Sequence, residues 1–150
     1  NGQQVGSEKY FYKLDWLVSL EKWISEEIKQ SPKMVILGDF NIAPSDQDVY
    51  DPVRWKGKIL CSEKERAAFE SLLSLGFKDA FRLFDTSSDS FTWWDYRLNG
   101  FKRGLGLRID HILVSKDLEK FCKNVVIEKR LRGLERPSDH ALIYADISSV

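Results

Sequence analysis

Apolar and polar positions follow a helical period in the first part of the chain. Across residues 9–30 the apolar side chains return about every 3.6 positions, with Lys and Glu between them, which predicts an amphipathic helix. Ser31-Pro32 should end it, because a residue before proline is pushed out of the helical region. The apolar run 34–37 that follows is typical of a strand buried on both faces. The helical stripe consists of Tyr10, Leu14, Leu17, Ile24 and Ile28.

A second helix is predicted after a polar loop that covers residues 43–60. Ser62 and Glu65 have the spacing of a capping box, in which each side chain caps the backbone N–H of the other, and Gly76 suits the C-terminal stop. Beyond it the chain is rich in apolar, aromatic and β-branched segments, which predict strands, and we expect one α/β unit. The strands cover 91–96, 107–114, 125–128 and 141–147, with a helical turn at 118–122.

Composition narrows the class of protein. The 150 residues are 43% hydrophobic and 31% charged, and 23 basic residues balance 23 acidic ones. This suits one domain with a hydrophobic core, and a nucleic-acid partner would be held by local basic clusters or a metal rather than by net charge. No apolar run reaches the ~20 residues of a membrane span and no signal peptide is visible. Cys61 and Cys122 lack metal or disulfide spacing. We therefore expect a cytoplasmic protein without a membrane partner.

Four polar segments stand near the ends of predicted strands, and each also has an ordinary structural explanation. Asp39 and Asn41 suit a turn that bonds its own backbone. Asp110 interrupts an apolar strand, so it either faces solvent or is held by a cation, a histidine or a metal. The Trp93-Trp94 pair is core by default, and only one of the two can face a ligand. The segments are 38–41, 92–97, 107–110 and 137–140.

Together these polar side chains are sufficient for most of a site that hydrolyses phosphodiesters. An aspartate beside a metal can align and deprotonate a water molecule. Charge that develops on the phosphate can be met by Asn41, His140 and Mg²⁺, and Mg²⁺ prefers carboxylate oxygens. A carboxylate such as Asp110 can keep His140 in the required tautomer. His111, the other histidine, is interpreted as an ordinary satisfied side chain.

The residues of these segments, and the order in which the segments follow one another, resemble the motifs of one protein family. Leu37-Gly38-Asp39-Phe40-Asn41 is similar to the GDxN signature of the endonuclease/exonuclease/phosphatase superfamily, and Ser138-Asp139-His140 is similar to its closing SDH. Segments 92–97 and 106–110 resemble those of the exodeoxyribonuclease III (AP endonuclease) branch. GDxN or SDH alone is a weak signal, whereas the four motifs in this order are specific. The similarity runs from about Tyr10 to the C-terminus.

The resemblance implies a fold. It predicts the C-terminal half of a DNase I-like four-layer α/β sandwich, with one mixed β-sheet and flanking helices. Residues 1–150 would be the C-terminal part of the domain, because the family's N-terminal half carries further site residues that are not present here. Asn1-Gly2 resembles the residues just after one of them. We expect the piece alone to be inactive and to expose an apolar sheet face that aggregates or pairs with its missing half.

The resemblance also implies roles for single residues. Asp39 would activate or position the attacking water, and Asn41 would support it and hold the scissile phosphate. His140 would contact the phosphate, and Asp110 would orient His140. Asp139 and Asp39 would lie at the metal, with Mg²⁺ as the expected ion and Mn²⁺ as the alternative.

For the substrate, the resemblance implies double-stranded DNA with abasic sites or 3′ ends. Trp93, Leu107 and Ile109 would line a small apolar pocket for a flipped-out abasic sugar, which an intact nucleotide would not fit. Basic residues flank every motif, and such clusters can follow phosphates. Among them we expect DNA contacts from Arg54, Arg97 and Arg108.

Two other interpretations stay open at this point. In the first, the chain comes from another enzyme of the superfamily that acts on RNA, phosphoinositides or sphingomyelin, since a fold does not determine the substrate. In the second, it is a non-catalytic fragment that binds DNA or a protein partner. The two segments 92–97 and 106–110 favour the DNA-repair branch over the first interpretation. The complete set of site residues argues against a degenerate parent protein but does not make this piece active on its own; the set is Asp39, Asn41, Asp110, Asp139 and His140.

Overall fold

The computed structural model describes residues 2–148 and has the expected α/β class. Asn1, on which part of the expectation about the start of the chain rested, lies outside the described residues. No helix in the described part is long and apolar enough to cross a membrane. The helices are α1 (Glu8–Gln30), α2 (Pro52–Trp55), α3 (Glu63–Ser74) and α4 (Lys116–Glu119), and the strands are β1 (Val35–Asp39), β2 (Phe77–Asp79), β3 (Trp93–Trp94), β4 (Gly106–Leu107), β5 (Asp110–Ser115), β6 (Cys122–Glu128) and β7 (Leu142–Ile147).

Both long helices begin at side-chain caps. The Ser7 hydroxyl caps α1 by accepting from the backbone N–H of Tyr10 at 3.2 Å. Ser62 and Glu65 form the predicted capping box of α3. Gly76 follows α3 with a φ of +100°, a left-handed conformation that glycine adopts without a Cβ clash. The predicted start and stop of α3 are therefore confirmed.

The strands divide into three antiparallel groups. β1, β5 and β2 form a sheet in the order β1-β5-β2, while β3 pairs with β4 and β6 pairs with β7. None of the described pairs is parallel, so the expectation of one mixed sheet is corrected. β5 already has β1 on one edge and β2 on the other. The β6–β7 hairpin packs against a face of that sheet instead of extending it.

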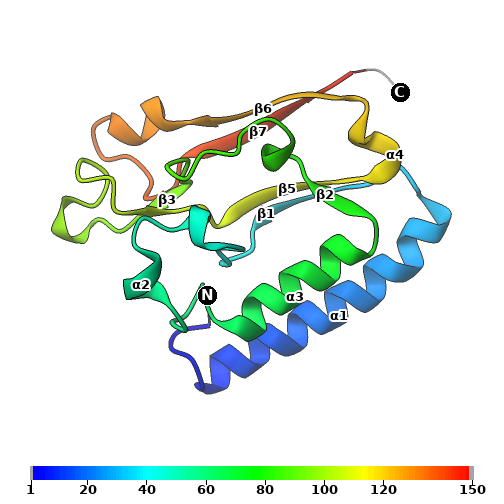
Figure 1. Ribbon diagram of the computed structural model, residues 1–150, viewed down its shortest axis with the longest axis horizontal. Coiled ribbons are helices and arrows are strands. Elements are labelled where there is room, and N and C mark those ends of the chain that lie inside the picture. Colours follow the sequence, from blue (N-terminus) through cyan, green and yellow to red (C-terminus); the bar gives the residue numbers. More distant parts are fainter. Residues whose placement is uncertain (1, 149–150) are drawn as a thin grey trace.

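Three layers result from this packing. In Figure 1, α1 and α3 lie side by side on one side of the β1-β5-β2 sheet, and β6 and β7 lie on the other side. Alternate residues of β5 serve the two interfaces, as the period of a strand requires. Leu113 packs with Phe69 and Leu72 of α3, whereas Ile112 and Val114 pack toward the hairpin. The described chain therefore contains strands of two β-layers.

Several strand predictions needed adjustment: β3 is shorter than the predicted 91–96, β6 begins before the predicted 125–128, and β2 was not predicted. Leu37 of β1 is 67% exposed, although the run 34–37 suggested burial on both faces. β1 is an edge strand, and neither the helices nor the hairpin covers Leu37. The predicted strand 107–114 is split into β4 and β5, because the chain leaves its pairing with β3 before it pairs with β1.

Candidate active site

Two of the predicted carboxylates meet across a strand pair. Asp39 ends β1, Asp110 begins β5, and the two are direct partners in the antiparallel register. The apolar residues before Asp39 and after Asp110 anchor the pair in the core, so its polar end lies at the edge of the sheet. His140 joins them, with Nδ1 2.8 Å from Asp110 Oδ2 and Nε2 3.9 Å from Asp39 Oδ2.

Asn41 turns back onto Asp39. Its backbone N–H donates to Asp39 Oδ1 at 2.8 Å, and its side-chain Nδ2 donates to Asp39 Oδ2 at 2.9 Å. The φ of Asn41 is +54°, a left-handed conformation that asparagine tolerates better than most residues. These two bonds thus form a local turn and also hold the side-chain amide of Asn41 against the Asp39 carboxylate.

His140 and Asp39 of the cluster have a raised pKa and hold their protons more tightly than usual. The hydrogen bond to the Asp110 carboxylate raises the pKa of His140, against the opposite effect of burial. Burial raises the pKa of Asp39, while the backbone N–H of Asn41 acts in the opposite direction. Because 35% of the Asp39 side chain stays exposed, solvent screens part of this effect. Asp39 is therefore a stronger base than an ordinary surface carboxylate.

Thr92 joins the strands that carry Asp110 and His140. Its buried hydroxyl oxygen accepts from the backbone N–H of Ile109 at 3.0 Å and of Asp110 at 3.1 Å. Its backbone carbonyl accepts from the N–H of Ala141, next to His140, at 2.7 Å. Sequence reasoning missed this role, because a threonine before two tryptophans carries no signal of its own.

The cluster has the donor atoms that a hard metal ion prefers. Ligand atoms of Asp39, Asp110 and His140 all lie within 4.8 Å of one another. Carboxylate oxygens suit Mg²⁺ and Mn²⁺, so the donor set fits the expected kind of ion. Asp139, the other expected metal ligand, lies outside this group, and its Oδ2 accepts from Trp93 Nε1 at 2.9 Å. The structure places Asp110 beside Asp39, and the expectation that Asp139 lies at the metal stays a prediction.

The three residues expected to line a sugar pocket belong to one apolar cluster, but two of them are buried. Leu107 is 0% and Ile109 2% exposed, beneath other side chains of that cluster. Trp93 is partly buried and packs on the same cluster, whereas Trp94 lies in the core. The expectation that only one of the two tryptophans is accessible is confirmed. Leu107 and Ile109 do not line an open pocket in this structure.

The three arginines expected to contact DNA have different environments. Arg54 and Arg97 are exposed, and Arg97 pairs with the neighbouring Asp95 at 2.6 Å. Arg108 is 1% exposed and bonds to Asp48 and Asp79, each at 2.7 Å. A buried guanidinium needs carboxylate partners, so Arg108 has a structural place, and the expectation that it contacts DNA is wrong.

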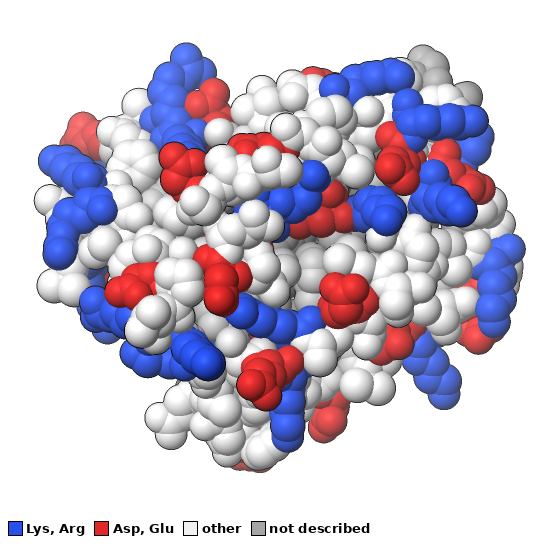
Figure 2. All heavy atoms as spheres, in the orientation of Figure 1, with Lys and Arg blue, Asp and Glu red and all other residues white. Residues whose placement is uncertain are grey.

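A groove beside Trp93 brings accessible aromatic and basic residues together. Its volume is about 480 Å³. On the face of the molecule drawn in Figure 2, Lys and Arg are interspersed with Asp and Glu, and no large region carries charge of one sign. Any attraction for phosphate is therefore local, as the zero net charge indicated. The residues that line the groove include Tyr50, Arg54, Trp55, Lys58, Trp93 and Arg97.

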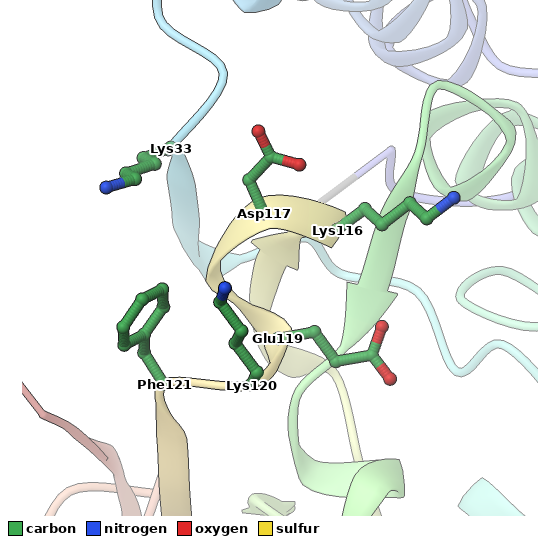
Figure 3. Close-up of a pocket in the computed structure, with 6 residues that line it drawn as sticks. All are labelled: Lys33, Lys116, Asp117, Glu119, Lys120 and Phe121. Atoms are coloured by element: carbon green, nitrogen blue, oxygen red, sulfur yellow. The ribbon is translucent and has the colours of Figure 1, made fainter. Parts of the chain in front are cut away.

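A second cavity, of about 580 Å³, lies beside α4 at the end of β5 away from Asp110. Three lysines surround it, but Figure 3 shows Lys33 and Lys116 pointing away from each other. Asp117 and Glu119 lie among them. Because the ammonium groups do not converge, this cavity is not a candidate anion site.

His111 is a satisfied core histidine, as predicted. It is fully buried, its Nε2 donates to the Ile42 carbonyl at 2.8 Å, and its Nδ1 accepts from Arg108 at 3.0 Å. Burial lowers its pKa to about 4, so it is neutral at ordinary pH. Its contact with the residue after Asn41 nevertheless ties it to the loop of the site.

Comparisons with known proteins match this geometry to one family. The model of the Endonuclease/Exonuclease/phosphatase family matches residues 3–140. Exodeoxyribonuclease III of Haemophilus influenzae is 41% identical over 145 residues, which cover 92% of this chain and 54% of that protein.

Solved structures agree on the fold. The 3′ phosphatase NExo from Neisseria, bound to a product DNA hairpin, superimposes with a TM-score of 0.97 at 45% identity. An AP endonuclease from Archaeoglobus fulgidus gives a TM-score of 0.92 at 35% identity. Each comparison covers 99% of this chain and 58% of the other. The chain thus spans little more than half the length of these relatives, and the DNase I-like fold expected for its part is confirmed.

Proposed function

The chain belongs to the endonuclease/exonuclease/phosphatase family, and from that premise we propose that it is the C-terminal part of a Mg²⁺-dependent DNA-repair phosphodiesterase. Its substrates would be duplex DNA at abasic sites and DNA 3′ ends, cleaved by AP-endonuclease and 3′→5′ exonuclease action. The observation that carries the proposal is the convergence of Asp39, Asn41, Asp110 and His140 at one sheet edge.

The geometry supports a division of labour for hydrolysis. Asp39 accepts a proton from the water that attacks phosphorus as the ester P–O bond breaks. Asn41 holds that carboxylate from one side. Asp110 accepts from Nδ1 of His140 and raises the pKa of the ring, and the protonated ring also has an Nε2 N–H on the Asp39 side that donates to a phosphate oxygen. Asp39 and Asp110 would hold the Mg²⁺, with Mn²⁺ as the alternative; when bound, it supplies positive charge for the phosphate oxygens.

The groove beside Trp93 supports DNA as the substrate. Arg54 and Lys58 are exposed on it, and Trp93 connects it to the site through its bond to Asp139. Cations next to an aromatic surface suit a phosphate backbone and its bases. In the proposal, Arg54 and Arg97 follow phosphates, while Trp93 contacts the sugar at the site.

The proposal includes the missing N-terminal half of the domain as a partner. The matched relatives are nearly twice as long. In the described part, β7 pairs with β6 on one edge alone, and its outer face exposes Leu142 and Tyr144 at 54% and 42%. An apolar face of this kind marks a contact surface. We propose that the chain is inactive until that half binds.

The test is a cleavage assay by complementation. The chain is mixed with the part of Haemophilus influenzae exodeoxyribonuclease III that precedes the region matched here. Substrates are a duplex with one abasic-site analogue, a duplex ending in a 3′ phosphate, and an RNA of the same sequence. We expect Mg²⁺-dependent cleavage of DNA by the mixture, none by either half, and none with EDTA or with Asp39→Asn. Cleavage of RNA alone, or no cleavage with a folded complex, would overturn the proposal.

A further inference from the structure

Two consecutive carbonyls in the loop of the site are held by side chains from different layers. The carbonyl of Asn41 accepts from Lys13 Nζ at 2.6 Å. The next carbonyl, that of Ile42, accepts from His111 Nε2 at 2.8 Å. Lys13 comes from α1 and His111 from β5, so the loop is fastened between the helix layer and the sheet.

The ammonium group of Lys13 is itself fixed in place. Only 11% of its side chain is exposed, and Nζ lies 2.5 Å from Oε1 of Glu65, which is 0% exposed. The second oxygen of Glu65 accepts from the backbone N–H and hydroxyl of Ser62 at the start of α3. A buried carboxylate of this kind needs its cation. The bond to Glu65 therefore fixes the position of Lys13 Nζ, and in that position Nζ donates to the Asn41 carbonyl.

We propose that Lys13 is a positioning residue for Asn41. By bonding the carbonyl of Asn41 it holds the left-handed backbone of that residue, and this backbone directs the side-chain amide to Asp39. The importance of this placement for catalysis rests on the proposed function.

A simple tie between α1 and α3 would require only the pair of Lys13 and Glu65. The additional bond from Lys13 to the Asn41 carbonyl distinguishes a positioning role from a purely structural link between the two helices. A change in the backbone angles of Asn41 would move its carbonyl away from Nζ, because rotation about the bonds of a residue reorients its own carbonyl. The bond therefore selects the conformation that Asn41 has at the site.

The variants must separate positioning from folding. Lys13→Met alone leaves Glu65 buried without its cation, so the informative variant is the double Lys13→Met/Glu65→Gln, compared with Glu65→Gln. Gln retains a capping oxygen for Ser62. Lys13→Arg retains a cationic donor. Lys29→Met, which removes an exposed pair with Glu26 on the same helix, is the matched control.

The first readout is the pair of backbone and side-chain amide resonances of Asn41 in the folded 150-residue chain. We expect both to shift in the double variant relative to Glu65→Gln, and to stay near the wild-type positions in Lys13→Arg and Lys29→Met. A folded double variant whose Asn41 resonances coincide with those of Glu65→Gln would overturn the proposal, whatever its melting temperature.

The second readout is the rate of DNA cleavage after complementation. Loss of positioning lowers kcat of the double variant about tenfold or more, with an unchanged KM, and Lys13→Arg restores most of it. An unchanged kcat in the folded double variant would contradict the proposal. If the wild-type mixture cleaves no DNA, the proposed function fails, and the Asn41 resonances still decide the role of Lys13.

Discussion

At the scale of single residues, the site depends on hydrogen bonds that select one state of a side chain. Asp110 selects the tautomer of His140 by accepting from Nδ1, and Asn41 restrains the Asp39 carboxylate through two bonds. Each of these bonds joins groups that are partly exposed. Loss of one of these bonds should therefore change the pKa of a neighbouring side chain more clearly than it changes the free energy of unfolding.

Replacement of Asp110 by Asn should lower the pKa of His140, because the carboxylate is the main cause of its increase. A raised pKa means that the folded chain binds the proton more tightly than the unfolded chain. That contribution to stability is complete below the ordinary pKa of 6.5 and is lost as the pH rises through the folded value. Titration of the histidine resonances in metal-free buffer measures the change. His111 should be unaffected, and a His140 pKa equal in both proteins would contradict the assignment.

Thr92 provides the second prediction for a single residue. Thr92→Val keeps the shape but leaves two buried backbone N–H groups, those of Ile109 and Asp110, without an acceptor. We expect a loss of about 1–3 kcal/mol in the free energy of unfolding. Thr92→Ser keeps the oxygen and should lose less. Urea unfolding compares the two, and a serine variant as unstable as the valine variant would exclude the hydroxyl as the cause.

At the scale of elements, the first three residues of β5 have three different roles. Asp110 faces the site, His111 holds the loop after β1, and Ile112 packs toward the hairpin. Just before them, Arg108 connects the loop at Asp48 with the end of β2 at Asp79. Because Arg108 is buried, its place beside a motif of the candidate site does not make it available to DNA.

Arg108→Met should destabilise the chain strongly. It leaves Asp48 and Asp79 without the guanidinium between them, and breaking a buried ion pair in this way costs about 3–5 kcal/mol. Chemical denaturation at pH 7 measures the loss. Arg97→Met, on an exposed side chain, is the control and should leave stability unchanged. A mild effect of Arg108→Met, equal to that of the control, would contradict a structural role.

Unlike Arg108, the exposed residues Arg54 and Arg97 should affect DNA binding and not stability. Arg54→Ala and Arg97→Ala are expected to leave folding intact and to weaken binding of the complemented protein to duplex DNA. Each phosphate contact that is lost should make the slope of log affinity against log salt shallower by about one. Fluorescence anisotropy at several salt concentrations gives the slope. A slope unchanged in both variants would remove this groove from the DNA-binding surface.

At the scale of the whole molecule, the helices cover one face of the β1-β5-β2 sheet and the hairpin covers the other (Figure 1). The outer face of the hairpin has no further layer in the described part, and Leu142 and Tyr144 are exposed there. A face of this type is a contact surface or an aggregation site. The three layers seen here would thus require a fourth to complete a four-layer sandwich.

The chain alone should therefore self-associate, and Leu142→Lys/Tyr144→Lys should suppress this association. The same double variant should fail to bind the N-terminal part used for complementation. Tyr12→Lys, at a 72% exposed position on α1, is the control and should change neither property. Sedimentation velocity over a range of concentrations measures both. A wild-type chain that stays monomeric and unfolds cooperatively would argue against an uncovered face.

The sequence alone was sufficient to predict much of the local structure and to select the candidate site residues. The capping box of Ser62 and Glu65, the stop at Gly76 and the position of Asp39 at the end of a strand depend on neighbouring residues, so a single sequence is sufficient to predict them. The motif order was enough to indicate the family as well, because it combines several specific segments.

Only the tertiary structure decided which side chains face the site. The arrangement joins residues far apart in the chain, as in the cluster of Asp39, Asp110 and His140, the burial of Arg108, and the contacts of Thr92 and Lys13. The partner of a polar side chain is set by the packing of whole layers, and no local pattern records it. The same reason explains why the strands form three antiparallel groups, since strand order depends on which edges the core leaves free.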